Sequence, residues 1–134
     1  MPKATVAAII TRQKDGRQQV LLARRNTEPF KNFLSLPGGH IDPYEPAKDA
    51  IIREVLEELG LDFAPEFQFY NDEIIPERGI HAVVGVFVGQ AVGKIDLSSG
   101  EISEVIWTDL NETPNLPLAF LHAQILTQYA LAIQ

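Results

Sequence analysis

Three glutamates near the middle of the chain have a spacing that could support metal chemistry. At positions i, i+3 and i+4 of a helix, Glu54, Glu57 and Glu58 would share one face. Like charges at i, i+4 destabilise a helix by roughly 0.2–0.5 kcal/mol per pair, a cost that a bound cation would offset. Mg²⁺ and Mn²⁺ take oxygen ligands, and Mg²⁺ is often held by carboxylates together with substrate phosphates. We therefore expect a metal site for a phosphorylated substrate; for Glu57 and Glu58 alone, a solvated acidic face is the alternative.

The helix that must position these carboxylates is predicted over residues 46–59. Pro46 suits the first turn of a helix, and no other Pro or Gly follows until Gly60, which suits the position just after the last turn. Apolar residues recur at i, i+4 and i+8 from Ile51, beside the acidic face. This stripe would hold the helix to a core and fix the carboxylates in place.

The glutamates belong to a longer pattern of fixed intervals. It consists of Gly39, Glu45, Arg53, Glu54, Val55, Glu57, Glu58, Gly60 and Leu61. Every fixed position of the Nudix box is filled in this pattern, so the chain resembles the Nudix hydrolases. One departure is Tyr44, because the residue before Glu45 is commonly Gly in that family.

The resemblance implies roles for the box residues. Glu57 and Glu58 carry over as ligands of Mg²⁺, or alternatively of Mn²⁺, and Glu54 as a third ligand or as the base that deprotonates the attacking water. A carbonyl of the glycine turn at residues 37–39 completes the metal shell in the family, and we select Gly38. Metal coordination acidifies water and neutralises charge on a diphosphate, as this hydrolysis requires.

Arg53 and Glu45 are expected to support the catalytic groups. Arg53 follows Glu45 by eight residues and precedes Glu57 by four, so its planar guanidinium can connect the loop carboxylate to the helix face. In related enzymes a Glu from a distant loop can be the base and join the metal site. Glu101 is the candidate that we place at the metal, with Glu104 and Glu77 as further candidates; ordinary exposed acids are the alternative for all three.

Other segments resemble the ADP-ribose pyrophosphatases within this family. The likeness lies in Arg24, Arg25, residues 28–31, residues 76–81 and residues 116–122. Leu121 departs from the Asp usual there, and an extra Ile precedes His81. Ordinary use of these residues by the fold is the alternative, with His122 on a helix surface.

This likeness indicates which residues contact the substrate. We expect Arg24, Arg25 or Arg78 to pair with phosphate, since a guanidinium suits bidentate contact. An aromatic ring would stack on adenine, and the candidates are Phe30, Tyr70, Phe87 and Phe120. The expected reaction is hydrolysis of ADP-ribose to AMP and ribose 5-phosphate. The alternatives are pyrophosphohydrolysis of a nucleoside triphosphate, or a module that senses a nucleotide without hydrolysing it.

The order of elements predicts the fold. Strands are expected over residues 4–11, 19–25, 33–36, 67–75, 79–90 and 104–108, and a last helix over residues 116–133. Residues 79–90 are almost continuously apolar, as in a strand buried on both faces. Strands and helices in this order predict an α/β fold, and the resemblance implies the Nudix α/β/α sandwich with a mixed sheet, as a single domain over residues 1–134.

Composition narrows the choice of partners. The chain has 134 residues, no Cys, and a net charge of −7, which argues against sequence-independent binding of nucleic acid. No signal peptide or membrane-spanning segment is evident, so we expect a cytoplasmic protein. Nudix domains of this size are often dimers, and a homodimer could use Leu97, Phe120 or Leu121.

Overall fold

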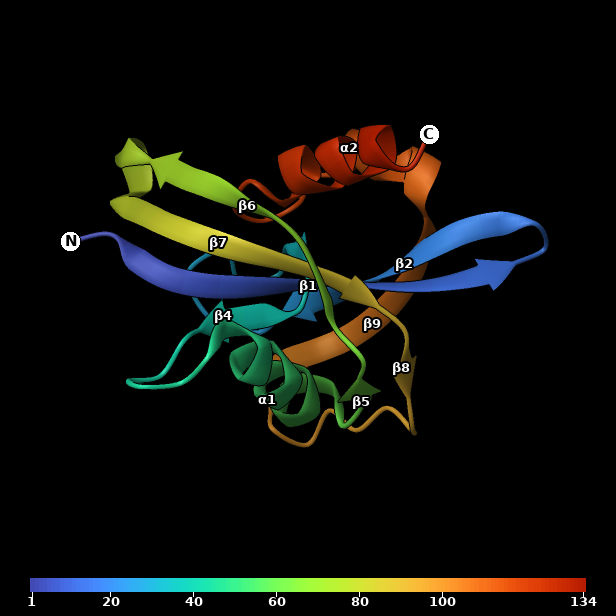
Figure 1. Cartoon of the computed structure of the whole chain (residues 1–134), viewed down its shortest axis with the longest axis horizontal. Helices are drawn as coiled ribbons and strands as arrows, with labels where there is room; N and C mark the ends of the chain where they lie inside the picture. The colour runs from blue at the N-terminus through green and yellow to red at the C-terminus, as the bar shows by residue number, and fades with distance from the viewer.

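The computed structural model describes all residues, 1–134, and shows a mixed sheet between two helices (Figure 1). The strands are β1 Lys3–Lys14, β2 Arg17–Arg25, β3 Leu34–Ser35, β4 Gly38–His40, β5 Asp62–Phe63, β6 Glu66–Ile75, β7 Ile80–Gly89, β8 Ala91–Val92 and β9 Ile102–Asp109. The α-helices are α1 Ala47–Leu59 and α2 His122–Ala132, and the 3₁₀ helices are η1 Pro76–Arg78 and η2 Leu110–Asn115.

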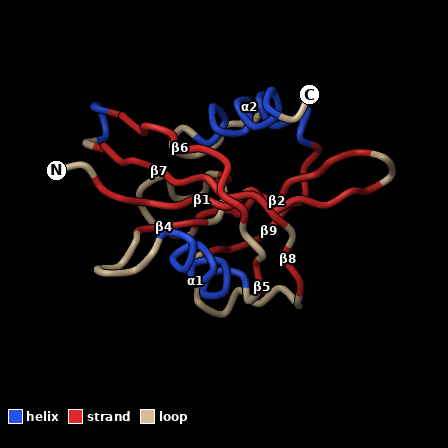
Figure 2. The backbone as a smooth tube through the Cα atoms, viewed as in Figure 1, coloured by secondary structure: helices blue, strands red, loops and turns tan.

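Seven strands form the main sheet in the order β3-β2-β1-β7-β6, with β4 added to β1 and β9 added to β2. β1 and β7 run parallel, whereas the other pairs are antiparallel. Figure 2 shows the strands, in red, as a layer with α1 on one side and α2 on the other. The predicted α/β sandwich with a mixed sheet is confirmed.

β1 contributes buried side chains to both faces of the sheet. Its residues alternate between two apolar clusters, with Val6, Ala8 and Ile10 packed toward α1 and Ala7 and Ile9 packed toward α2. All five side chains are buried. β2 alternates between the same two clusters, so both layers of the fold are assembled on these two strands.

The expectation that residues 79–90 form a strand buried on both faces was wrong for the first half of β7. Val83 is 43% exposed and His81 is also exposed. Only Phe87 of this strand belongs to the cluster beneath α1. The helix therefore covers one end of β7 and leaves the other end open on that face.

The last helix begins later than the sequence predicted, at His122 instead of residue 116. Leu118 forms a parallel bridge to Leu34, and the Ala119 N–H donates a hydrogen bond to the Leu34 carbonyl at 2.8 Å. Phe120 then adopts a left-handed conformation with φ of 54°. These contacts with β3 hold the chain out of the helix until His122.

Neither α-helix of the chain is both long and apolar enough to cross a membrane.

Candidate active site

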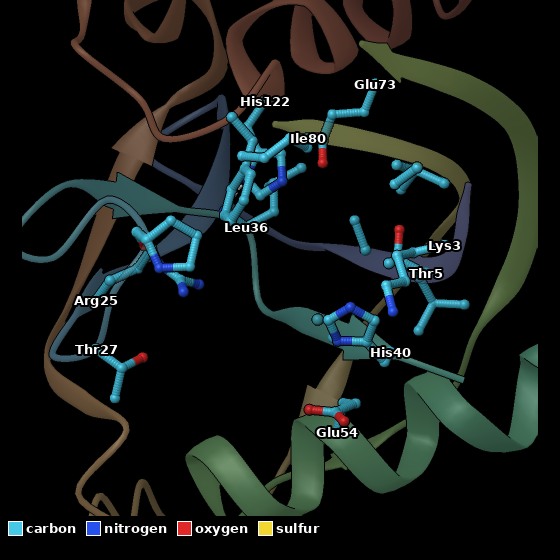
Figure 3. A pocket seen from close by; sticks show the side chains of 18 of the residues that line it. Lys3, Thr5, Arg25, Thr27, Leu36, His40, Glu54, Glu73, Ile80 and His122 are labelled. Atoms are coloured by element: carbon cyan, nitrogen blue, oxygen red, sulfur yellow. Dashed lines mark hydrogen bonds between the residues drawn. The ribbon is translucent and has the colours of Figure 1, made fainter. Parts of the chain in front are cut away.

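A pocket of about 640 Å³ lies between α1 and the start of α2 (Figure 3). At its α1 end the polar lining consists of Gly38, Gly39, His40, Asp42, Glu54, Glu58 and Glu101. At its α2 end the lining includes Leu36, Glu73, Ile80, Ala82, Val84, Phe120 and His122. The pocket thus has an acidic end and a more apolar end, and Figure 3 shows Glu54 and Glu73 far apart within it.

The glycines beside α1 lie in strand β4, where the sequence predicted a turn. Neither Gly38 nor Gly39 has a positive φ, and Gly38 pairs with Ala7 of β1. A Cβ atom on Gly38 would lie 2.1 Å from the Val6 carbonyl oxygen, and one on Gly39 would lie 2.7 Å from the Glu54 carboxyl group. Glycine is required here because neighbouring groups approach the backbone closely.

The helix α1 directs two of the three predicted carboxylates into the pocket. Glu54 and Glu58 line it, and the Gly38 N–H donates a hydrogen bond to Glu58 Oε1 at 3.2 Å. The Glu57 side chain is 53% exposed and lies outside the lining. Because no three acidic or His side chains are gathered as a metal site in this structure, the ligand set that includes Glu57 and the Gly38 carbonyl stays a prediction.

Arg53 holds the loop before α1 against the helix. Its Nε and Nη2 donate to the two oxygens of Glu45 at 2.8 and 3.0 Å, and its Nη1 donates to Glu54 at 2.9 Å and to Glu57 at 3.2 Å. Nη2 also donates to the His40 carbonyl at 3.1 Å. The contacts expected of Arg53 and Glu45 are present, and their effect on catalysis stays a prediction.

The charge of Arg53 and the burial of the carboxylates shift the pKa values in opposite directions. The hydrogen bonds from Arg53, and then the Asp42 backbone N–H, lower the pKa of Glu45 to about 2. Burial, and then the charge of Glu54, raise the pKa of Glu58 to about 8, while the Gly38 N–H opposes that shift. Burial also raises the pKa of Glu54, although Arg53 opposes it. Glu54 and Glu58 are thus two oxygen donors whose charged forms burial disfavours, and a hard divalent cation beside them would stabilise those charged forms.

Of the arginines predicted to bind phosphate, only Arg25 lines the pocket. Its Nε donates to the Pro29 carbonyl at 2.7 Å, and its guanidinium lies 4.9 Å from the centre of the Phe120 ring. Arg24 pairs with Glu104 and donates to the Asn32 carbonyl at 2.9 Å. Glu104 on β9 and Asn32 in the loop after β2 thus hold Arg24 outside the pocket, and its role in phosphate binding stays a prediction.

Arg78 and Phe30 also lie outside the lining, and the substrate contacts expected of them stay predictions. The Arg78 guanidinium stacks over the Phe30 ring, 3.8 Å from the ring centre. The Phe30 side chain is buried, and its ring centre lies 4.8 Å from that of Phe120. Phe30 therefore packs against other side chains of the protein, and Arg78 covers its ring. Among the distant acids, Glu101 lines the pocket, whereas Glu77 and Glu104 do not, and the role of Glu101 at the metal stays a prediction.

Two titratable groups of the lining were missed or misplaced by sequence reasoning. The alternative that placed His122 on a helix surface is wrong, because His122 is buried and its Nδ1 accepts a hydrogen bond from the Leu36 N–H at 2.9 Å. Burial, and then the charge of Arg25, lower the pKa of His122 to about 3. Glu73 received no role, since the sequence does not show which of Asp72 and Glu73 faces inward; Glu73 is the buried one.

The geometry agrees with comparisons to known proteins. Residues 1–129 match the NUDIX domain family, and the chain therefore belongs to the Nudix hydrolases. An ADP-ribose pyrophosphatase of Methanocaldococcus jannaschii is 33% identical over 132 residues, covering 96% of this chain and 73% of that protein. A putative 8-oxo-dGTP diphosphatase of Bacillus subtilis is 47% identical over only 47 residues, or 35% of this chain and 30% of that protein.

Solved structures support the same family. A MutT NUDIX hydrolase from Burkholderia pseudomallei has a TM-score of 0.82 and 28% identity, covering 96% of this chain and 98% of that one. The NUDIX domain of Shewanella oneidensis NrtR, solved with ADP ribose, has a TM-score of 0.86 and 23% identity, covering 100% of this chain and 90% of that one. At this identity the comparison shows that the two folds are alike. As a member of this family, the protein is a hydrolase of diphosphate-bearing substrates, a class that generally depends on divalent metal ions.

Proposed function

We propose that the protein hydrolyses the diphosphate linkage of a nucleoside diphosphate derivative, and that ADP-ribose, cleaved to AMP and ribose 5-phosphate, is its substrate. The observation that carries the reaction is the pocket that gathers Glu54, Glu58 and Glu101 with Arg25. The choice of ADP-ribose rests on the likeness to the Methanocaldococcus jannaschii pyrophosphatase along almost the whole chain.

The α1 end of the pocket is the place for the diphosphate. Glu54, Glu57, Glu58, Glu101 and the Gly38 carbonyl would hold Mg²⁺, or alternatively Mn²⁺. When bound, such an ion acidifies water and neutralises charge on the phosphates. Glu54 lines this end of the pocket and would be a third ligand or the base that deprotonates the attacking water.

Positive charge in the lining would help to bind the phosphates. The chain carries a net charge of −7, and the acidic end of the pocket would repel a diphosphate. Arg25 and Lys3 are the Arg and Lys side chains of the lining. Arg25 is fixed by Pro29 and Phe120, so its guanidinium is held ready for a phosphate.

A second candidate is pyrophosphohydrolysis of a nucleoside triphosphate. It is favoured by the 47% identity to the putative 8-oxo-dGTP diphosphatase, although this covers 35% of the chain. The two reactions share the box and differ in the leaving group. A sensing module without turnover is less well supported, because every glutamate of the box is present.

Product analysis distinguishes these candidates. The protein would be incubated with ADP-ribose, dinucleotides, nucleotide sugars and nucleoside triphosphates, each with Mg²⁺ and with Mn²⁺, and the products separated by chromatography. We expect AMP and ribose 5-phosphate from ADP-ribose; pyrophosphate from a triphosphate would support the second candidate. Glu57→Gln and Glu58→Gln should each lower kcat by more than about 100-fold, whereas Glu66→Gln, an exposed acid on β6, should not. Unchanged activity in the first two variants would refute the assigned metal site.

A further inference from the structure

The buried carboxylate of Glu73 has no role in the reaction described above. The residue lies on β6, is 5% exposed, and lines the pocket at the end away from α1 (Figure 3). Its Oε2 atom is buried and has no hydrogen-bond partner. Burying such an oxygen without a partner is unfavourable, so Glu73 is a group that a ligand could satisfy.

The protein satisfies this carboxylate only in part. Burial raises the pKa of Glu73, while a hydrogen bond from the Leu121 backbone, and then the charge of Arg25, oppose that shift. No ion pair joins Glu73 to Arg25, and Oε2 is left without a partner. Asn71 lies on the same face of β6 and also has an unpartnered amide, yet it does not line the pocket. Because Glu73 itself lines the pocket, a ligand bound there could supply the partner that Oε2 lacks.

The surroundings of Glu73 indicate which part of a substrate would reach it. Ala82, Val84, Ile80 and Leu36 give this end an apolar lining. A flat ring with few polar atoms fits such walls better than a sugar, whose hydroxyl groups point in several directions. With the diphosphate at the α1 end, the nucleobase would occupy this end.

We propose that Glu73 is a specificity-determining residue that accepts a hydrogen bond from an amino group on the nucleobase. This inference rests on the proposed function, because it takes the nucleoside of the substrate to lie in the pocket. A site with a buried acceptor discriminates against a ligand that lacks the matching donor, since the acceptor is then left unpaired. For adenine, the donor is the exocyclic amino group.

The test compares AMP with purine riboside 5′-monophosphate, which lacks that amino group. Neither ligand contains a diphosphate, so binding is measured without turnover, by calorimetry or NMR titration. Wild-type protein should bind AMP about 10- to 100-fold more tightly. Glu73→Leu should bind both ligands equally, and Glu73→Gln, which keeps one acceptor oxygen, should retain part of the ratio.

Asp72→Asn is the matched control, because Asp72 is the neighbouring acid but is exposed on the other side of β6. It should keep the full ratio. Thermal unfolding would verify that each variant is folded, and Glu73→Gln preserves the shape of the side chain if Glu73→Leu is unstable. Equal binding of the two ligands by wild type, binding of neither, or an unchanged ratio in a folded Glu73→Leu protein would overturn the proposal. Hydrolysis of ADP-ribose is measured in a separate assay. The proposed function can therefore fail while the preference for the amino group is observed, and the preference can be absent while ADP-ribose is hydrolysed.

Discussion

The two glycines of β4 should respond very differently to the addition of one methyl group. A Cβ atom on Gly39 would lie 2.7–2.8 Å from three atoms of the Glu54 carboxyl group. An ordinary contact begins near 3.4 Å, so the carboxyl group must move by roughly 0.7 Å. Glu54 is the far end of a flexible side chain, so Gly39→Ala should fold normally and lose less than about 1 kcal/mol of stability.

The activity of Gly39→Ala should nevertheless fall, because the displaced carboxylate is one of the proposed catalytic groups. Misplacing a reacting group by about 1 Å can cost on the order of 100-fold in rate. We therefore expect kcat to decrease by about 10- to 100-fold, measured with whichever diphosphate substrate the wild type hydrolyses. The movement would also disturb the 2.9 Å hydrogen bond from Arg53 to Glu54.

Gly38→Ala is the informative comparison. Its Cβ atom would lie 2.1 Å from the Val6 carbonyl oxygen, which is part of the β1 backbone and cannot rotate away. The pairing of β4 with β1 would have to separate, at a cost of about 2–4 kcal/mol. Thermal unfolding should detect this as a lower Tm. Full activity in Gly39→Ala, or an unchanged Tm in Gly38→Ala, would refute the reasoning from close approach.

Two further predictions concern the loop before α1 and the buried histidine. Tyr44 has φ of 63° and a fully exposed side chain. Tyr44→Gly should therefore relieve backbone strain and stabilise the fold by about 0.5–1 kcal/mol, measured by denaturant unfolding. Tyr44→Ala keeps the Cβ atom and should show no such gain. His122 has a pKa near 3 in the folded protein and about 6.5 when unfolded, so the stability from its neutral form is lost as the pH falls from 6.5 toward 3. As the pH falls from 6.5 to 4.5, the free energy of unfolding of the wild type should decrease by about 2–3 kcal/mol more than that of His122→Asn. Parallel curves of unfolding free energy against pH for the two proteins would contradict the assignment.

The parts of the structure that local sequence could predict are those in which neighbours along the chain decide the outcome. The helix α1 ends at Gly60, whose φ of 72° is the left-handed conformation that the sequence suggested. The hairpin between β1 and β2 turns at Asp15 and Gly16, which both have positive φ. Propensity and turn chemistry are sufficient at these positions.

Contacts between distant segments decided the rest. The start of α2 depends on the contact of Ala119 with Leu34, and the need for Gly39 depends on Glu54 across a strand and a helix. Likewise, the choice of Arg25 over Arg24 for the pocket depends on which face of β2 meets the cavity. No local pattern contains this information, because each outcome requires the partner to be placed first.

β1 carries a consequence for how the molecule unfolds. Because its successive side chains belong to the apolar clusters on opposite sides of the sheet, neither cluster can come apart without withdrawing residues from the other. Such an arrangement favours one cooperative transition over stepwise melting of the α1 and α2 layers. Thr5, Val6 and Ala7 of the same strand also line the pocket. A ligand bound there would thus stabilise the whole chain against opening, by a free energy that grows with the logarithm of the ratio of its concentration to its Kd.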